Sequence, residues 1–200
     1  MKLVFSDKHN FRKVILPTYK ANRQGKRKPC AYYGLKKWIE ENYDCVSMPY
    51  LEGDDVCSIV AESYEGEAVI LSIDKDMKTC AAKYFDFNNE VLYEPSQESA
   101  EYWWFKQTLT GDVCDGFTGL SGCGPKTAEK ILNKDCSWDS VVAAYAAKGL
   151  TESDALLQAR VARILHKEDY DMEKCQIKLW NSEGQQRDVF DCRSGALLCI

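Results

Sequence analysis

Two tight clusters of carboxylates constrain this chain more than any other feature of its sequence. They are Glu52, Asp54 and Asp55, and then Asp74 and Asp76. The second cluster follows the apolar run 68–73, whose short length and β-branched content predict a buried strand. The first precedes apolar residues at helical spacing. The start of a helix and the carboxyl end of a strand meet at the edge of an α/β sheet where ligands bind.

The close spacing of these carboxylates predicts bound cations. Two carboxylates ~4 Å apart repel by roughly 4 kcal/mol at a protein-like effective dielectric constant. Mg²⁺ or Mn²⁺, which prefer oxygen ligands, would relieve that repulsion. The alternative for each cluster alone is structural: Asp54 and Asp55 complement a helix dipole, and Asp74 and Asp76 are turn residues.

Two further acidic sites support the functional interpretation. Asp7 follows the strand expected over residues 2–6, so it adds a third acidic contribution to the same edge. Asp112 and Asp115 are three residues apart before a glycine and become neighbours if the segment forms a helical turn. They are candidates for the fourth acidic site.

The charge distribution favours a polyanionic substrate. The 200-residue chain carries a net charge of −5, which argues against a uniformly basic surface for nucleic acid. Residues 8–39 nevertheless contain ten Lys or Arg and no acidic residue, and the carboxylates follow. This segregation suits a substrate whose backbone contacts a basic arm while its reacting phosphate meets metal ions.

Within the basic segment, aromatic and cationic side chains alternate around a flexible glycine. Such interleaving is typical of phosphate contacts combined with stacking on an unpaired base. A solvated basic loop is the alternative interpretation. The candidate DNA-binding residues here are Tyr19, Lys20, Arg23, Lys26, Arg27 and Lys28.

A glycine-rich turn follows Asp115 and leads into a helix that begins at Pro125. Glycines let a phosphate approach the backbone, and the N–H groups of the following helix hold it. The segment looks like a helix-hairpin-helix that grips DNA without reading sequence, although an isolated pattern of this kind is also typical of an ordinary helix start. The candidate residues are Gly122, Gly124, Lys126 and Thr127.

The remaining composition excludes several classes of protein. The ten cysteines form no CxxC pair and only His9 and His166 accompany them, so the pattern does not favour zinc. The absence of a signal peptide predicts a reducing cytoplasm, that of the host cell if a phage encodes the chain. No apolar run reaches the ~18 residues that a membrane span needs, so no membrane partner is expected.

The motifs FSDKHNFRK, YKANR, LEGDDV, SIDKDMK and TGDVCDGFTGLSGCGPKTA, in this order, resemble the flap endonuclease and 5′–3′ exonuclease superfamily. Among its members, the chain is most similar to the stand-alone exonucleases of podovirus-type bacteriophages. The resemblance implies an α/β fold with a mostly parallel sheet flanked by helices. It implies a catalytic core over residues 1–108 with a basic arch over about 18–37, a helix-hairpin-helix region over 109–180, and a tail over 181–200 whose role it leaves open.

The resemblance also implies roles for individual residues. Lys20 and Arg23 would contact the scissile phosphodiester, with Asp7, Asp54 and Asp74 completing the catalytic set. Residues 24–29 would form a short arch for a 5′ single strand, and the glycine-rich turn would hold K⁺ through backbone carbonyls. The eight carboxylates implied to hold two or more Mg²⁺ ions are Asp7, Glu52, Asp54, Asp55, Asp74, Asp76, Asp112 and Asp115.

The implied function is Mg²⁺-dependent 5′–3′ hydrolysis of double-stranded DNA from its 5′ ends, in phage replication, recombination or host DNA degradation. RNA primers, RNA/DNA hybrids and flaps are the implied further substrates. The protein is expected to be a monomer. Members of the superfamily begin with an additional strand that carries a first Asp, and no matching segment precedes FSD here. The alternatives are therefore a structure-specific DNA-binding module with reduced activity, or one half of a split enzyme completed by a separate chain. A more distant alternative is an RNA-directed PIN-type nuclease, a class that lacks the glycine-rich turn.

Overall fold

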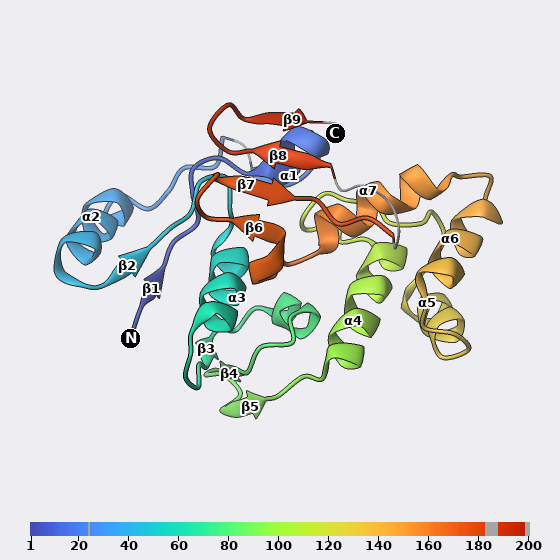
Figure 1. Ribbon diagram of the computed structural model, residues 1–200, viewed down its shortest axis with the longest axis horizontal. Helices are drawn as coiled ribbons and strands as arrows, with labels where there is room; N and C mark the ends of the chain where they lie inside the picture. Colours follow the sequence, from blue (N-terminus) through green and yellow to red (C-terminus); the bar gives the residue numbers. More distant parts are fainter. Residues whose placement is uncertain (24, 183–187, 199–200) are drawn as a thin grey trace.

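The computed structural model describes residues 1–23, 25–182 and 188–198, and it has a mixed α/β fold (Figure 1). This confirms the predicted α/β class. The predicted arch includes Gln24, which lies outside the described residues. No helix in the described ranges is long and apolar enough to cross a bilayer.

The parallel strand pairs that carry the acidic motifs belong to two small sheets. β1 (Leu3–Val4) pairs in parallel with β2 (Cys45–Val46). β3 (Ile70–Leu71) pairs in parallel with β4 (Tyr84–Asp86). β5 (Val91–Tyr93) pairs antiparallel with β4 and completes this second sheet. The predicted parallel pairing is therefore present, but it is divided between the two sheets.

The strand before Asp74 is shorter and less buried than the apolar run predicts. Ile70 is 6% exposed and packs with Met77, Cys80 and Tyr84, whereas Leu71 is 62% exposed. The expectation of a strand buried on both faces is wrong, because only one face of β3 meets the core of the described structure. An uninterrupted apolar run cannot distinguish these two situations.

Helices bring the acidic motifs onto this framework. α1 (Phe11–Ile15) has Asn10 as its N-cap, whose side chain accepts a hydrogen bond from the Arg12 N–H. α3 (Gly53–Ser63) has Glu52 as its N-cap and carries Asp54 and Asp55 in its first turn. The short 3₁₀ helix η2 (Lys75–Thr79) begins directly after Asp74. Each cluster therefore lies where a helix starts, and the exposed backbone N–H groups of a helix start favour nearby negative charge.

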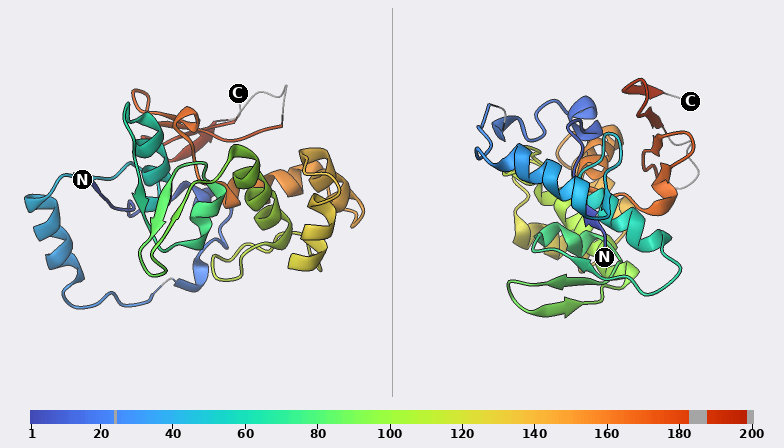
Figure 2. Two further views of the ribbon diagram at one scale, coloured as in Figure 1. Left: turned by 90° about the horizontal axis from the view of Figure 1, so that it is seen from below. Right: turned by 90° about the vertical axis from the view of Figure 1, so that its left-hand side faces the viewer.

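The basic segment projects away from this framework. The 3₁₀ helix η1 (Ala21–Arg23) is followed by α2 (Tyr32–Asn42), which has no buried residue. α2 lies with β1 and β2 at one end of the molecule (Figures 1 and 2). Its apolar side chains are exposed, including Tyr33 at 71% and Trp38 at 51%.

The helical region lies at the opposite end (Figure 1). It comprises α4 (Gln97–Thr110), α5 (Pro125–Leu132), α6 (Trp138–Ala146) and α7 (Glu152–Ala162). Buried polar contacts join its helices, because Trp104 Nε1 donates to Ala159 O at 2.8 Å and Tyr145 OH donates to Thr108 O at 2.8 Å.

The C-terminal segment forms a sheet that the sequence did not indicate. After the 3₁₀ helix η3 (Lys167–Asp169), the strands β6 (Tyr170–Asp171), β7 (Gln176–Lys178), β8 (Val189–Asp191) and β9 (Ala196–Leu198) pair antiparallel in chain order. Phe190 and Ile177 pack with Phe11 and Leu51 of the N-terminal part. The division into segments 1–108, 109–180 and 181–200 stays a prediction, but this core crosses both of its boundaries.

Two glycines let the chain cross itself at the end of α4. Gly111 and Gly119 both have positive φ, and a Cβ atom on Gly119 would lie 2.3 Å from the Gly111 nitrogen. The Gly119 N–H donates to Gln158 Oε1 at 2.9 Å, which fixes the crossing against α7. The loop between the two glycines carries Asp112 and Asp115, so the crossing determines where these two carboxylates lie.

We expect Gly119→Ala to lower the free energy of unfolding by more than about 2 kcal/mol, because it combines backbone strain with a steric overlap that the fixed crossing cannot relieve. Gly149→Ala is a matched control: Gly149 also has positive φ, but nothing lies within 4 Å of its added Cβ. The control should lose only about 1 kcal/mol. Urea denaturation of both variants measures the difference, and equal losses would contradict the crossing described here.

Candidate active site

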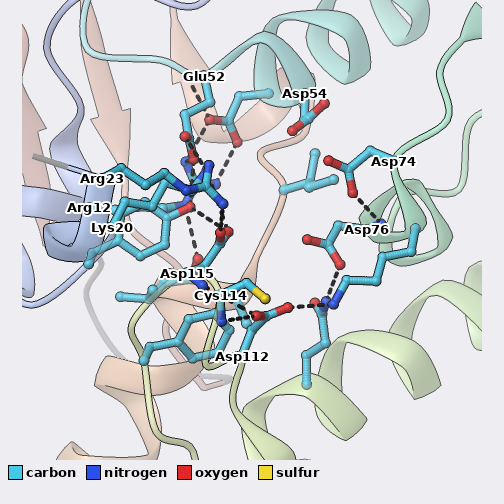
Figure 3. A pocket seen from close by; sticks show the side chains of 18 residues that line it. Arg12, Lys20, Arg23, Glu52, Asp54, Asp74, Asp76, Asp112, Cys114 and Asp115 are labelled. Carbon is cyan, nitrogen blue, oxygen red and sulfur yellow. Dashed lines mark hydrogen bonds and ion pairs between the residues drawn. The ribbon is translucent and has the colours of Figure 1, made fainter. Parts of the chain in front are cut away.

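One cavity of about 160 Å³ gathers acidic side chains from α3, η2 and the loop after α4 (Figure 3). Its lining contains seven of the eight predicted metal-binding carboxylates, all except Asp7. It also contains four cationic side chains, so the lining carries three more negative than positive groups. The carboxylates are Glu52, Asp54, Asp55, Asp74, Asp76, Asp112 and Asp115, and the cations are Arg12, Lys20, Arg23 and Lys75.

Asp55 has a structural role that differs from the predicted one. Its carboxylate is fully buried and receives both terminal nitrogens of Arg12 at 2.7 Å. It also accepts hydrogen bonds from the backbone N–H groups of Glu52 at 3.1 Å and Leu165 at 3.0 Å. Because four donors already surround its two oxygens, Asp55 is not placed to bind an ion in the cavity.

Asp54, the neighbour of Asp55, has the opposite environment. Within the described part of the chain its carboxylate receives no hydrogen bond and forms no ion pair. Burial, together with the negative charges of Asp74, Asp55 and Glu52, raises the pKa of Asp54 to about 7. Asp54 is therefore a half-buried carboxylate that forms no ion pair with any described residue.

Asp74 and Asp76 lie on the same side of the cavity as Asp54 (Figure 3). Asp74 accepts a hydrogen bond from the Asp76 N–H at 2.9 Å, which places it at the start of η2. Gln107 of α4 donates its side-chain amide to Asp76. Burial and the charge of Asp74 raise the pKa of Asp76 to about 6. Together with Asp54, these residues form the part of the site where like charges crowd most closely.

Lysine and arginine side chains already neutralise the other carboxylates. Lys20 Nζ lies 2.5 Å from Glu52 Oε1 and 3.4 Å from Asp115 Oδ2, and Arg23 Nη2 lies 2.5 Å from Asp115 Oδ1. Burial raises the pKa of Glu52, but the charges of Arg12 and Lys20 outweigh it and lower that pKa to about 2. Glu52 is therefore ionised throughout the neutral range.

Lys20 is held in the cavity by its backbone as well. It has a positive φ of 51°, and its N–H donates to Asp115 O at 2.6 Å. Gly116 allows this approach, because a Cβ atom there would lie 2.5 Å from Thr18 O. The predicted basic pair Lys20 and Arg23 thus faces Asp115 of the predicted acidic pair. The backbone contact between Lys20 and Asp115 requires the glycine at position 116.

Two further residues of the site were not singled out from sequence. Arg12 pairs with Asp55, and Lys75 places its Nζ 2.5 Å from Asp112 Oδ2. Lys75 lies between the two aspartates of the second cluster, and this position could have indicated it. Nothing about Arg12 distinguishes it from the other basic residues of its segment, because its partner lies 43 positions away in the sequence.

Asp7 was predicted to be a catalytic metal ligand and Tyr19 a DNA-binding residue, and the structure gives both other surroundings. Asp7 lies outside the cavity lining, where its carboxylate accepts N–H groups from Tyr50 at 3.0 Å and His9 at 3.3 Å. Tyr19 is 3% exposed and its hydroxyl donates to Glu52 at 2.6 Å. A buried ring cannot stack on a base, so Tyr19 orients Glu52 instead.

The other predicted DNA-binding residues are exposed and lie outside the carboxylate cavity. Lys26, Arg27 and Lys28 belong to the basic segment between η1 and α2. The second group belongs to the turn and first residues of α5, where Gly124 is the N-cap and Pro125 the first helical residue. That group comprises Gly122, Gly124, Lys126 and Thr127.

The donor set of the cavity fits a hard divalent cation. Its unpaired and crowded groups are carboxylate oxygens, the ligands that Mg²⁺ and Mn²⁺ prefer. As the side chains stand, no three His, Cys, Asp or Glu groups among the described residues converge closely enough to hold an ion. The lysine and arginine side chains hold several of these oxygens, so an ion would have to compete with them.

Known proteins similar in sequence to this chain are exonucleases and flap endonucleases. No protein-family model matches it. The exonuclease of Escherichia phage T7 is 32% identical over 89% of this chain and 72% of that protein. The chain therefore belongs to the 5′–3′ exonuclease and flap endonuclease superfamily. The exodeoxyribonuclease of Enterobacteria phage T3 is 31% identical with the same coverage, and the flap endonuclease Xni of Vibrio campbellii is 29% identical over 70% of this chain and 58% of that protein.

Solved structures of this superfamily share the fold. The 5′-exonuclease of phage T5 with bound zinc superposes with a TM-score of 0.58 at 17% identity, over 80% of this chain and 72% of that one. A T5 flap endonuclease complex with DNA and metal ions gives 0.59 at 17% identity with the same coverage. The superfamily, the α/β fold and the enzyme class predicted from sequence are thus confirmed.

The contrast between Asp55 and Asp54 can be tested on protein stability alone. Asp55→Ala leaves the Arg12 charge buried without its partner and should lower the free energy of unfolding by roughly 3–5 kcal/mol. Asp54→Ala removes a carboxylate that only repels its neighbours and should not lower it. Chemical denaturation in EDTA at pH 8 compares the two, and a larger loss for the Asp54 variant would contradict their assigned roles.

The pH dependence of stability provides a second test. Because the pKa of Asp54 in the folded protein, about 7, lies above its ordinary value of 3.8, the folded state binds this proton more tightly than the unfolded state. The stabilisation that the protonated Asp54 side chain contributes is fully present below about pH 4 and is lost as the pH rises towards 7. In EDTA, the unfolding free energy of Asp54→Asn relative to the parent should therefore rise over pH 4–7. If the unfolding free energies of the variant and the parent changed in parallel with pH, the pKa of Asp54 would not be raised in the folded protein.

Proposed function

We propose that the chain is a Mg²⁺-dependent 5′–3′ exonuclease that hydrolyses phosphodiesters from the 5′ ends of double-stranded DNA, with flaps, RNA primers and RNA/DNA hybrids as further substrates. The observation that carries this proposal is the convergence of seven carboxylates and four cationic side chains on one cavity. The names of the phage T7 and T3 relatives support the same activity.

In this proposal Asp54, Asp74 and Asp76 hold the divalent cations on one wall. Their surplus negative charge is relieved when cations bind, which gives binding a local driving force. Asp112 on the facing side completes the ligand set once Lys75 moves away. Bound Mg²⁺ would supply an activated water and charge stabilisation for the leaving oxygen. The T5 structures were solved with metal ions bound, which is consistent with this assignment.

Lys20 and Arg23 would receive the scissile phosphodiester. Both already contact carboxylate oxygens in the cavity, so they are positioned to contact the anionic oxygens of a phosphate there. Arg23 is half exposed, with 51% of its side-chain surface accessible, whereas Lys20 is enclosed at 14%. We assign Lys20 to stabilise the charge that develops on the phosphate and Arg23 to guide the strand from solvent.

The exposed basic segment and the glycine-rich turn would hold the DNA at a distance from the reaction. Lys26, Arg27 and Lys28 are exposed and would contact backbone phosphates of a 5′ strand. The N–H groups at the start of α5 suit a phosphate of the duplex, with K⁺ on nearby carbonyls. A monomer in the cytoplasm, acting in phage replication, recombination or host DNA degradation, completes the proposal.

One observation supports a partner strand in addition. Leu71 and Ile73 at the edge strand β3 are 62% and 53% exposed, and β3 pairs only with β4 in the described structure. An apolar strand supplied by another polypeptide would cover them. Increased cleavage after addition of such a polypeptide would support this, and unchanged cleavage with no binding would exclude it.

The proposed activity predicts a specific loss of cleavage. With Mg²⁺ and 5′-labelled duplex DNA, the protein should release short products, and Asp74→Ala combined with Asp112→Ala should slow single-turnover cleavage by at least about 100-fold. Asp139→Ala, at an exposed position in α6, is the matched control and should retain the parent rate.

Three outcomes separate the alternatives. Full activity of the double variant would refute the assignment of the cavity. Tight binding of flap DNA by the parent without metal-dependent turnover would favour a DNA-binding module. Equal cleavage of single-stranded RNA and duplex DNA would favour a nuclease of the PIN type.

A further inference from the structure

A second cavity, of about 180 Å³, adjoins the carboxylate cavity across the wall formed by η2 and α4. The two cavities share Lys75, Asp76, Gln107 and Asp112 in their linings. The second one, which we call the Trp103 cavity, has a largely apolar surface, and its charged lining residues are Lys75, Lys78, Lys106, Asp76 and Asp112. Because the two share a wall, a strand bound with its reacting phosphate at the carboxylates passes within a few nucleotides of the Trp103 cavity.

Two lysines converge on the ring of Trp103. Lys78 Nζ, from η2, lies 4.9 Å from the ring centre, and Lys106 Nζ, one helical turn after Trp103 in α4, lies 4.4 Å from it. Trp103 is only partly buried, whereas the adjacent Trp104 is in the core. Trp103 therefore lies within cation–π distance of two ammonium groups that come from different elements.

These two positive charges are incompletely balanced. Lys78 forms no ion pair with any described residue beyond its contact with the ring. Lys106 pairs with Glu129 of α5 at 2.7 Å, but 45% of the Glu129 side chain is exposed, and a pair of that kind contributes little stability. An anion bound at the Trp103 cavity would supply Lys78 with a counter-charge, and Lys106 could exchange Glu129 for it.

We propose that Lys78 and Lys106 bind one backbone phosphate of the DNA substrate, and that Trp103 is a positioning residue that holds both ammonium groups in place. The proposal rests on the proposed function, because it extends the path of the same DNA strand. A phosphate is the anion that fits, since it presents several oxygens to two lysine donors and recurs at every nucleotide along the strand. Such a contact fixes the register of the strand without reading its sequence.

The alternative is that Trp103 only packs α4 against η2. Binding measurements in EDTA, where no cleavage occurs, distinguish the two roles. For a labelled duplex with a 5′ flap, we expect Lys78→Ala to weaken binding several-fold and to lower the slope of log K against log salt concentration by about 1. Lys83→Ala is the matched control, because Lys83 lies outside both cavities and pairs with Glu67 and Glu94. An unchanged slope for Lys78→Ala would overturn the proposal.

A neutral phosphate analogue then locates the contact. Single methylphosphonate linkages are placed in turn at each position within three nucleotides of the cleavage site. At one linkage, removal of the charge should weaken binding by the parent protein but not by Lys78→Ala, because the contact is already lost in the variant. Additive effects at every linkage would show that Lys78 contacts no particular phosphate and would overturn the proposal.

The role of Trp103 is tested with two substitutions of different chemistry. Trp103→Leu keeps an apolar side chain but removes the aromatic face, so it should reproduce most of the loss seen with Lys78→Ala. Trp103→Phe should restore most of the binding. Thermal unfolding of both variants establishes that they are folded. Parent-like binding by Trp103→Leu would mean that the ring does not position the lysines.

The results also separate this inference from the proposed function. If the parent protein cleaves DNA and Lys78→Ala binds as the parent does, the phosphate contact is refuted and the nuclease assignment stands. If the parent protein does not cleave but the methylphosphonate effect depends on Lys78, the contact is supported and the catalytic assignment fails.

Discussion

The buried ion pair between Arg12 and Asp55 fixes the arrangement on which the site depends. Arg12 reaches Asp55 in α3 through two 2.7 Å contacts, and its Nε donates to Val161 O at the end of α7. Asp55 in turn accepts the Leu165 N–H. One guanidinium therefore joins the basic N-terminal segment, the acidic helix and the end of the helical region. The pair compensates the desolvation of both charges only because nearly every donor and acceptor is satisfied.

This arrangement explains how adjacent aspartates acquire different roles. Successive residues of a helix point about 100° apart, so Asp55 faces the core while Asp54 faces the cavity. The first meets a complementary cation and the second meets other carboxylates. The stability that the Arg12–Asp55 ion pair contributes offsets the unfavourable repulsion between Asp54 and its neighbouring carboxylates. A site that binds cations must tolerate such crowding when it is empty, and its surroundings must therefore be rigid.

The sequence predicted the composition of the site better than its internal pairing. Short-range patterns locate Asp74 after a strand and Glu52 at a helix start, because strand and helix signals are local. They cannot separate Asp54 from Asp55, since the difference arises from Arg12 and Leu165, which are distant in the chain. The same limit applies to Tyr19, whose aromatic and cationic neighbours indicate stacking on a base although its ring is buried.

The fold shows a similar division between local and distant information. Caps at Ser96, Ser137 and Thr151 mark where α4, α6 and α7 begin, and each accepts the expected backbone hydrogen bond. The sheet β6–β9 escaped prediction because its strands are two or three residues long, which is too short for an alternating pattern to emerge. It is stabilised instead by Phe190 and Ile177 against the N-terminal core.

The cations of the cavity determine how a strand of DNA would enter it. An empty site with seven carboxylates would repel a polyanion, yet Lys20, Arg23 and Lys75 each contact one or more of those carboxylates. In the proposed site, a metal ion that takes the Asp112 oxygens would release Lys75 from its internal partner and leave its ammonium group available for phosphate. Binding of the metal and binding of DNA would thus be coupled through shared side chains, since each partner releases the charge that the other needs.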